Sequence, residues 1–229
     1  RAKTVICGGK VIDDNLFSKV KRVSPIGLNS VKSKDLNKSD FITKDKIQNT
    51  NVIGIIEGKI ITEHIREDIP IIDGDKAPDI SRDLIRVSVI ERHGKNNNIA
   101  NGFVRGFGLK KGAVASTVAH DHHNIVSIGV EYEDMALACN RIKEIDGGFV
   151  IACQGEIISE LPLPIAGLMS LESFETVKNQ LVELRKSAKD LGIILEEPFL
   201  QLAFLALPVI PSLKITDFGM VDVEKFKII

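Results

Sequence analysis

Strand-like segments that follow one another through short turns are the feature that most limits how this chain can fold. Between residues 84 and 161, LIRVSVIER alternates apolar and polar residues, NIVSIGV is almost continuously apolar, and GFVIACQGEIISEL has a Gly turn between two apolar stretches. A parallel sheet needs a crossover, usually a helix, between successive strands, and a single helical pattern interrupts this series. The sequence therefore predicts an α+β fold: a mostly antiparallel sheet with helices packed on one face, plus a small N-terminal β segment.

Three segments have the apolar spacing of helices. The first is YEDMALACNRIKEID, whose apolar residues fall on one face. Residues 170–191 carry one apolar stripe at spacings of three and four, with Ser170 as the expected N-cap and Gly192 as the expected stop. Residues 198–207 open with proline and are apolar on nearly every side, which predicts a buried helix.

The same patterns divide the chain into three parts. Residues 1–20 contain two short strand patterns around a Gly-Gly turn, which predict the small N-terminal β segment. Residues 21–80 begin as a polar, lysine-rich stretch and then resume a strand pattern around a Glu-Gly turn, which predicts a connecting arm with a β-hairpin. Residues 81–229 form the predicted α+β domain.

Composition excludes several classes of function. The formal net charge is −1, so no strong field attracts nucleic acid or an anionic membrane, and no Trp and a single Tyr are available to stack on bases. No apolar run approaches the roughly 20 residues of a membrane span. The cysteines Cys7, Cys139 and Cys153 are an odd number without CxxC spacing. We therefore expect small buried thiols, a reducing cytoplasm, and no nucleic-acid or membrane partner.

Three of the five histidines gather in TVAHDHHNIV, residues 117–126. If this segment is extended, His120 and His122 point to one side and Asp121 and His123 to the other, so a metal would need a further ligand from elsewhere, such as Glu91 or His93. The alternative is a polar loop between strands whose imidazoles bond to backbone groups. The local sequence favours the polar loop and leaves the metal site open.

The glycine-rich segment GFVRGFGLKKG invites a phosphate-loop interpretation. Phosphate loops, however, place Gly-Lys-Ser/Thr before a helix, whereas this segment leads into the strand-like AVASTVA. We therefore interpret it as hairpin glycines with solvated lysines.

Several long blocks resemble the C-terminal part of bacterial adenine deaminases. They are ERHG, GFVRGFGLKKGA, VASTVAHDHHNIVSIG, EDMALACNRIKEIDGGFVIACQGEIISELPLPIAGLMS and EPFLQLAFLALPVIPSLKITDFGMVDV. The likeness is close over residues 85 to 223 and looser over residues 1 to 80. It implies a role in the hydrolytic deamination of adenine to hypoxanthine and ammonia, in purine salvage.

The resemblance also implies where the metal lies. Adenine deaminases are amidohydrolases whose manganese or iron sits at the mouth of a (β/α)₈ barrel, and such a barrel takes roughly 250 residues. This chain has neither the length nor the strand–helix alternation for one, and its opening residues resemble the small β-domain that flanks such barrels. His122 stands where the family usually has Ser, so the literal His-x-His is interpreted as accidental. We expect no cofactor on this chain and little activity from it alone.

Three hypotheses remain for the cluster formed by His120, Asp121, His123 and Asn124 with the nearby Glu91, Arg92 and His93. In the first, the loop helps to shape the adenine pocket at the barrel mouth. In the second, the chain is a non-catalytic structural or oligomerisation domain, and the cluster is a polar network at an interface with the metallo-barrel domain or in a homo-oligomer. In the third, His120, His122 and His123 form an independent metal-binding module.

Overall fold

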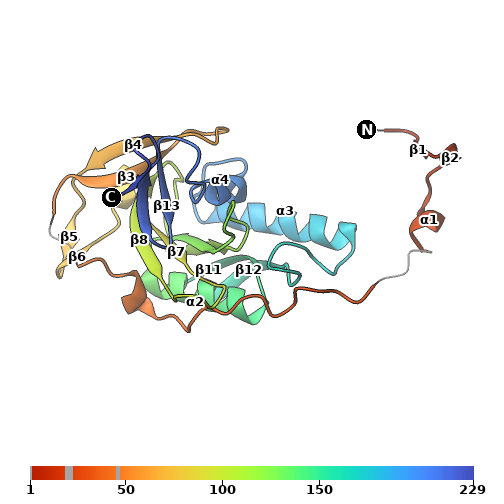
Figure 1. Ribbon diagram of the computed structural model, residues 1–229, viewed down its shortest axis with the longest axis horizontal. Coiled ribbons are helices and arrows are strands. Elements are labelled where there is room, and N and C mark those ends of the chain that lie inside the picture. The colour runs from red at the N-terminus through yellow and green to blue at the C-terminus, as the bar shows by residue number, and fades with distance from the viewer. Residues whose placement is uncertain (1, 19–22, 45–46) are drawn as a thin grey trace.

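The computed structural model describes residues 2–18, 23–44 and 47–229. Its centre is an eight-stranded sheet in the order β12-β11-β9-β10-β7-β8-β3-β4 (Figure 1). All neighbouring strands are antiparallel except β3 and β8, which are parallel. The strands are β3 (Thr50–Ile55), β4 (Thr62–Glu67), β7 (Leu84–Ile90), β8 (Ile99–Arg105), β9 (Ala113–Ser116), β10 (Ile125–Gly129), β11 (Gly148–Cys153) and β12 (Glu156–Pro162). The predicted α+β class and mostly antiparallel sheet are confirmed.

Helices cover both faces of this sheet. Helix α2 (Tyr132–Glu144) packs on one face, and α3 (Phe174–Asp190) and α4 (Pro198–Phe204) pack on the other. The sequence analysis expected the helices on one face of the sheet, whereas the structure places them on both faces. The reason is visible in β11, where consecutive residues are apolar: Val150 and Ala152 face α2, while Ile151 and Cys153 face the core under α3 and α4. Among the described residues, no helix is both long and apolar enough to cross a bilayer.

A second, three-stranded sheet lies on the α4 side over β7 and β8 (Figure 1). It consists of β13 (Leu213–Thr216), β14 (Gly219–Asp222) and β15 (Lys227–Ile228). Met220 packs so close to β8 that a Cβ on Gly102 would lie 2.8 Å from its sulfur.

The N-terminal residues form a small hairpin apart from the large sheet (Figure 1). Strands β1 (Ile6–Cys7) and β2 (Lys10–Val11) pair antiparallel around two glycines with positive φ, and α1 (Asp14–Ser18) follows. This confirms the predicted N-terminal β segment. Cys7 is exposed, because neither side of a two-stranded hairpin is covered here, so the expectation that all three thiols are buried was wrong. The predicted boundary at residues 20 and 21 lies outside the described residues.

Residues 27–41, which we call the strap, run along the α2 face of the sheet. The sequence predicted a connecting arm outside the core. Instead Val31, Leu36 and Phe41 are buried against the α2 layer, and the strap ends in a 3₁₀ turn, η1 (Lys38–Phe41). Irregularly spaced apolar residues in a polar segment give no periodic signal, so this packing is not readable from sequence.

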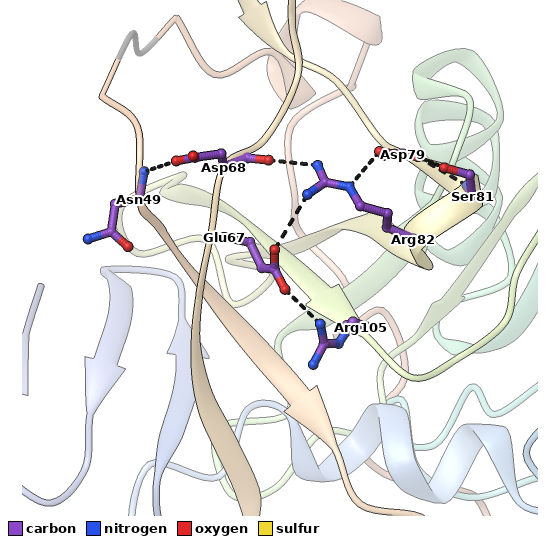
Figure 2. Close-up of polar contacts among 7 residues, drawn as sticks. All are labelled: Asn49, Glu67, Asp68, Asp79, Ser81, Arg82 and Arg105. Atoms are coloured by element: carbon purple, nitrogen blue, oxygen red, sulfur yellow. Dashed lines mark hydrogen bonds and ion pairs between the residues drawn. The ribbon is translucent and has the colours of Figure 1, made fainter.

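The hairpin expected around the Glu-Gly turn is present as β3 and β4, and it forms one edge of the large sheet. The end of β4 is fixed by an exposed network of ion pairs and hydrogen bonds (Figure 2). Glu67 accepts hydrogen bonds from Arg105 (2.7 Å) and Arg82 (3.4 Å), and Arg82 also binds Asp79 (2.7 Å) and the Asp68 carbonyl (2.6 Å). This ties β4 to β8 and to a 3₁₀ turn, η2 (Ile80–Arg82). A short hairpin, β5 (Ile71–Ile72) and β6 (Asp75–Lys76), lies between β4 and η2 in the chain.

The glycine-rich segment is not a hairpin turn. Strands β8 and β9 do not pair, because β7 and β10 lie between them in the sheet. The Asp83 carboxylate accepts hydrogen bonds from the N–H groups of Gly106 (2.9 Å) and Gly108 (2.8 Å), which bends the chain toward β9. The glycine is required at 106 because a Cβ there would lie 2.7 Å from Ile55.

One helix start also differs by a few residues from the prediction. Helix α3 begins at Phe174, and its N-cap is Ser173, whose hydroxyl accepts from the N–H of Thr176 (3.2 Å). The expected N-cap, Ser170, lies in the preceding turn and accepts from the N–H of Glu172 (3.1 Å). Two serines three residues apart offer the same capping chemistry, so sequence alone does not separate them.

Candidate functional site

The histidine loop, residues 117–124, connects β9 to β10, and the segment Glu91–His93 leaves β7 beside it. The two segments meet because β10 pairs antiparallel with β7, with Ile125 opposite Ile90. His93 Nε2 lies 2.8 Å from the His122 carbonyl and donates to it. The structure thus brings together the two short motifs that the sequence analysis grouped.

Asn124 is a buried link between these segments and the C-terminal sheet. Its Oδ1 accepts from the Arg92 N–H (3.3 Å), and its Nδ2 donates to Asp217 (3.2 Å). Asp217 also accepts from the side chain of Asn96 (3.3 Å). Sequence analysis missed Asp217, which is 93 positions from Asn124 in the turn between β13 and β14. Both ends of the Asn124 amide are therefore bonded within the protein.

Glu91 shapes the turn that follows β7. Its buried carboxylate accepts from four backbone N–H groups, those of His93, Lys95 (3.0 Å), Asn96 (3.3 Å) and Asn97 (3.2 Å). Burial on its own would raise the pKa of Glu91, but the four N–H groups outweigh it and lower the pKa below its usual value. The side chain is an ionised acceptor whose oxygens are occupied by the backbone.

Arg92 is a buried cation that joins three segments. Its Nε donates to the His123 carbonyl, its Nη1 lies 3.1 Å from the Ser30 hydroxyl, and its Nη2 donates to the Ala166 carbonyl (2.9 Å). Burial lowers the pKa of the guanidinium, and the charge of Asp146 opposes this effect. All of its side-chain hydrogen-bond acceptors are neutral oxygens, so Arg92 acts as a structural fork and not as part of a direct ion pair.

His120 and His123 are partly exposed and lie edge to face, with ring centroids 5.3 Å apart. His120 also lies against Phe204 at the end of α4, with centroids 5.7 Å apart. The N–H of Ala119 donates to Nδ1 of His123 (3.3 Å), so the neutral ring carries its proton on Nε2. Burial, with the nearby His120 and Arg92, lowers the pKa of His123. His123 is therefore a neutral hydrogen-bond donor at neutral pH.

His122 is turned inward, and Asp121 is exposed. Nδ1 of His122 accepts from the N–H of Asn124 (3.1 Å), and its Nε2 is buried. Burial lowers the pKa of His122, although the Asp217 carboxylate opposes this. Asp121 extends from the loop into solvent.

The donor atoms of the loop do not fit a metal centre. A metal needs three or four converging ligands, but Nδ1 of His122 and Nδ1 of His123 each accept a backbone N–H, and the Glu91 oxygens are filled. Within residues 2–18, 23–44 and 47–229, no group of three His, Cys, Asp or Glu side chains could hold a metal ion. The third hypothesis, an independent metal-binding module at His120, His122 and His123, finds no support in this geometry.

Known proteins match this chain over its whole length. Residues 59–227 match the family model described as adenine deaminase C-terminal domain. An adenine deaminase of Cereibacter sphaeroides is 56% identical over 228 residues, and adenine deaminase 1 of Rhizobium johnstonii is 58% identical over 229 residues. Each alignment covers 100% of this chain and 40% of the relative. An adenine deaminase of Brucella abortus is 54% identical, again over 100% of this chain and 39% of its own length.

The chain thus spans about 40% of the length of the curated relatives it matches. The family match begins in the turn between β3 and β4 and ends in β15, so it includes the histidine loop, the three-stranded sheet and every strand of the eight-stranded sheet except β3. Together with the identity across all 229 residues, it places the chain in a family. The chain belongs to the adenine deaminase C-terminal domain family.

Proposed function

We propose that this chain is the C-terminal part of an adenine deaminase, a hydrolase that converts adenine and water to hypoxanthine and ammonia in purine salvage. The observation that carries the proposal is the 54 to 58% identity to proteins named adenine deaminase, which extends over 100% of this chain. Identity at this level across both sheets and the histidine loop supports a shared role in the larger enzyme.

We assign the metal of this reaction, manganese or iron, to a barrel domain outside these residues. A metal activates water by lowering its pKa. His122 and His123 support this assignment, because Nδ1 of each ring accepts a backbone N–H, and the described residues contain no group of three side chains that could hold a metal ion. The metallo-barrel domain is then the principal partner of this chain, and adenine is the substrate they serve together.

The histidine loop is the surface that we assign to this partner. Glu91, Arg92 and Asn124 are buried and fully engaged, so they form the framework of the loop. His120 and His123 are partly exposed, and the neutral ring of His123 carries its proton on Nε2. A neutral imidazole donor suits a ring nitrogen of adenine or a carbonyl of the barrel. Asn124 is not assigned to adenine, because both ends of its amide are already bonded.

A structural role between subunits is the second candidate. Several large apolar side chains are exposed near the end of α4 and on the C-terminal sheet, including Leu200 (51%), Val209 (58%), Phe218 (64%) and Phe226 (81%). Such side chains favour burial against another surface. For this reason we include a homo-oligomer in the proposal. We also propose a cytoplasmic location, because all three cysteines are free thiols.

The test uses the complete polypeptide that contains these residues. Purified protein loaded with manganese or iron should release hypoxanthine and ammonia from adenine in equal amounts. A preparation that binds metal but leaves adenine unchanged would overturn the assignment of activity.

The loop is tested by His123→Ala in the same polypeptide, with His64→Ala as the matched control. His64 lies on β4 and bonds to Asn51 (2.8 Å), away from the loop. We expect His123→Ala to lower kcat/KM at least about tenfold, the scale of a lost positioned donor, and His64→Ala to have a much smaller effect. Equal kinetics in wild type and His123→Ala, with unchanged folding, would remove the loop from the site.

A further inference from the structure

The strap is held on the body of the protein by main-chain hydrogen bonds as well as by its buried side chains. The carboxylate of Asp146, just after α2, accepts from the N–H groups of Asn29, Ser30 (2.7 Å) and Val31 (3.1 Å). The N–H of Lys32 donates to the Arg92 carbonyl (2.7 Å). Three consecutive N–H groups on one carboxylate form a charge-assisted clamp.

A single side chain, that of Arg92, bridges this clamp and the histidine loop. Ser30 donates its N–H to Asp146, and its hydroxyl and carbonyl oxygens lie 3.1 and 3.4 Å from Nη1 of Arg92. The other side of the same guanidinium donates to the His123 carbonyl. A single planar group thus connects the strap to His123, whose neutral ring carries its proton on Nε2.

The third arm of Arg92 reaches the loop between β12 and α3. Its Nη2 donates to the Ala166 carbonyl, and the N–H of Ala166 donates to the Gly27 carbonyl at the start of the strap (2.8 Å). A Cβ at Gly167 would lie 2.9 Å from the guanidinium, so the segment is fitted closely around Arg92. The strap therefore contacts the Arg92 environment at both Gly27 and Ser30.

We propose that Arg92 is a positioning residue for His123, and that Asp146 fixes the position of the Arg92 guanidinium by holding the strap in place. The consequence of this coupling for the reaction rests on the proposed function, in which His123 faces adenine or the barrel; the coupling itself does not.

The chemistry of Arg92 explains why this coupling is specific. Its three nitrogens donate in one plane to three separate segments, a geometry that the point-like ammonium of lysine cannot reproduce. If the fork is lost, the His123 carbonyl is released, and the Ala119 N–H no longer holds Nδ1. The charged and titratable groups around His123 are His120, Asp121, Arg92 and His93, so Arg92→Lys preserves the charge while removing the geometry.

The test measures the His123 tautomer by side-chain ¹⁵N NMR of the 229-residue chain, without substrate. Wild type should show His123 with its proton on Nε2 and slow exchange of the Asn29–Val31 amides. Arg92→Lys and Asp146→Asn should each give a mixture of tautomers, and Asp146→Asn should speed exchange of those amides at least about tenfold. Arg185→Lys is the matched control, because Arg185 pairs with Glu197 on the exposed side of α3 (2.9 Å).

Unchanged His123 tautomers in both variants, with folding intact, would overturn the proposal. If Arg92→Lys fails to fold, Asp146→Asn and Ser30→Ala decide the question, since each leaves the guanidinium in place. In the complete polypeptide, Asp146→Asn should also lower kcat/KM for adenine about tenfold. A protein that never deaminates adenine refutes the proposed function alone, and the NMR result then still decides the coupling.

Discussion

Replacing Glu91 with glutamine probes the framework of the histidine loop. Oε2 of the carboxylate accepts from the N–H groups of Lys95, Asn96 and Asn97, and Oε1 accepts from that of His93. Glutamine has nearly the same shape but carries only one acceptor oxygen. Whichever way the amide turns, at least one of the four N–H groups faces an NH₂ group, and the remaining bonds lose their charge assistance.

The cost follows from these four contacts. A hydrogen bond to a charged group contributes about 1.5–3 kcal/mol, against roughly 1 kcal/mol for a neutral one, and an unsatisfied buried donor costs about 1–3 kcal/mol. Because the four contacts share one acceptor group they do not add fully, and we expect Glu91→Gln to destabilise the fold by about 3 kcal/mol. For a chain of this size that corresponds to a fall in Tm of roughly 6–12 °C.

The pH dependence gives a second signature. The pKa of Glu91 is lower in the folded protein than its usual value, so its stabilisation is present above the unfolded pKa and declines as pH falls through the folded pKa. Urea unfolding of the 229-residue chain at several pH values measures both effects, with exposed Glu156→Gln as control. A Glu91→Gln variant within about 0.5 kcal/mol of wild type at pH 7, below the normal cost of losing such bonds, would refute the reasoning. So would a difference that persists unchanged into strong acid.

Three further predictions concern the fold. Gly148→Ala should destabilise the chain by about 3 kcal/mol or more, because φ is +132° and a Cβ would lie 1.9 Å from the Leu161 carbonyl oxygen. A variant whose urea unfolding midpoint equals that of wild type would contradict this. Burial lowers the pKa of Lys214 to about 8, so the folded state binds fewer protons than the unfolded state between about pH 8 and 10.5. The stability of wild type relative to Lys214→Met should therefore rise with pH over that window, and a flat difference would argue against it. Arg82→Ala should cost about 1 kcal/mol or less, because its ion pairs with Glu67 and Asp79 are solvent-exposed (Figure 2); a loss of several kcal/mol in thermal unfolding would disprove this.

Local pattern predicted the parts of the fold that depend on nearest neighbours. The strands β7, β10, β11 and β12 and helix α2 followed from apolar periodicity and glycine turns. The parallel pairing of β3 with β8 did not follow, because it joins segments about 50 residues apart without a pattern that specifies the partner. The use of both sheet faces could have been inferred from the continuously apolar β10 and β11, whose residues are buried on either side.

The candidate site was predictable in its members but not in its bonding. Glu91 and His93 were grouped with the histidine loop as candidate metal ligands, the ERHG block of the resemblance added Arg92, and the structure brings the two segments together through the β7–β10 pairing. The partners that organise them, Asp146 and Asp217, lie far away in sequence in turns that have no special signal. Burial and hydrogen bonding of such distant groups are tertiary properties, so a single sequence does not specify them.

The most direct test of the central claim is adenine conversion by the 229-residue chain alone, incubated with manganese or iron and compared with the complete polypeptide at equal concentration. The account predicts hypoxanthine from the complete polypeptide and none above background from the 229 residues, because Nδ1 of His122 and Nδ1 of His123 each accept a backbone N–H and no group of three side chains among the described residues could hold a metal ion. Rapid hypoxanthine formation by the shorter chain would contradict it.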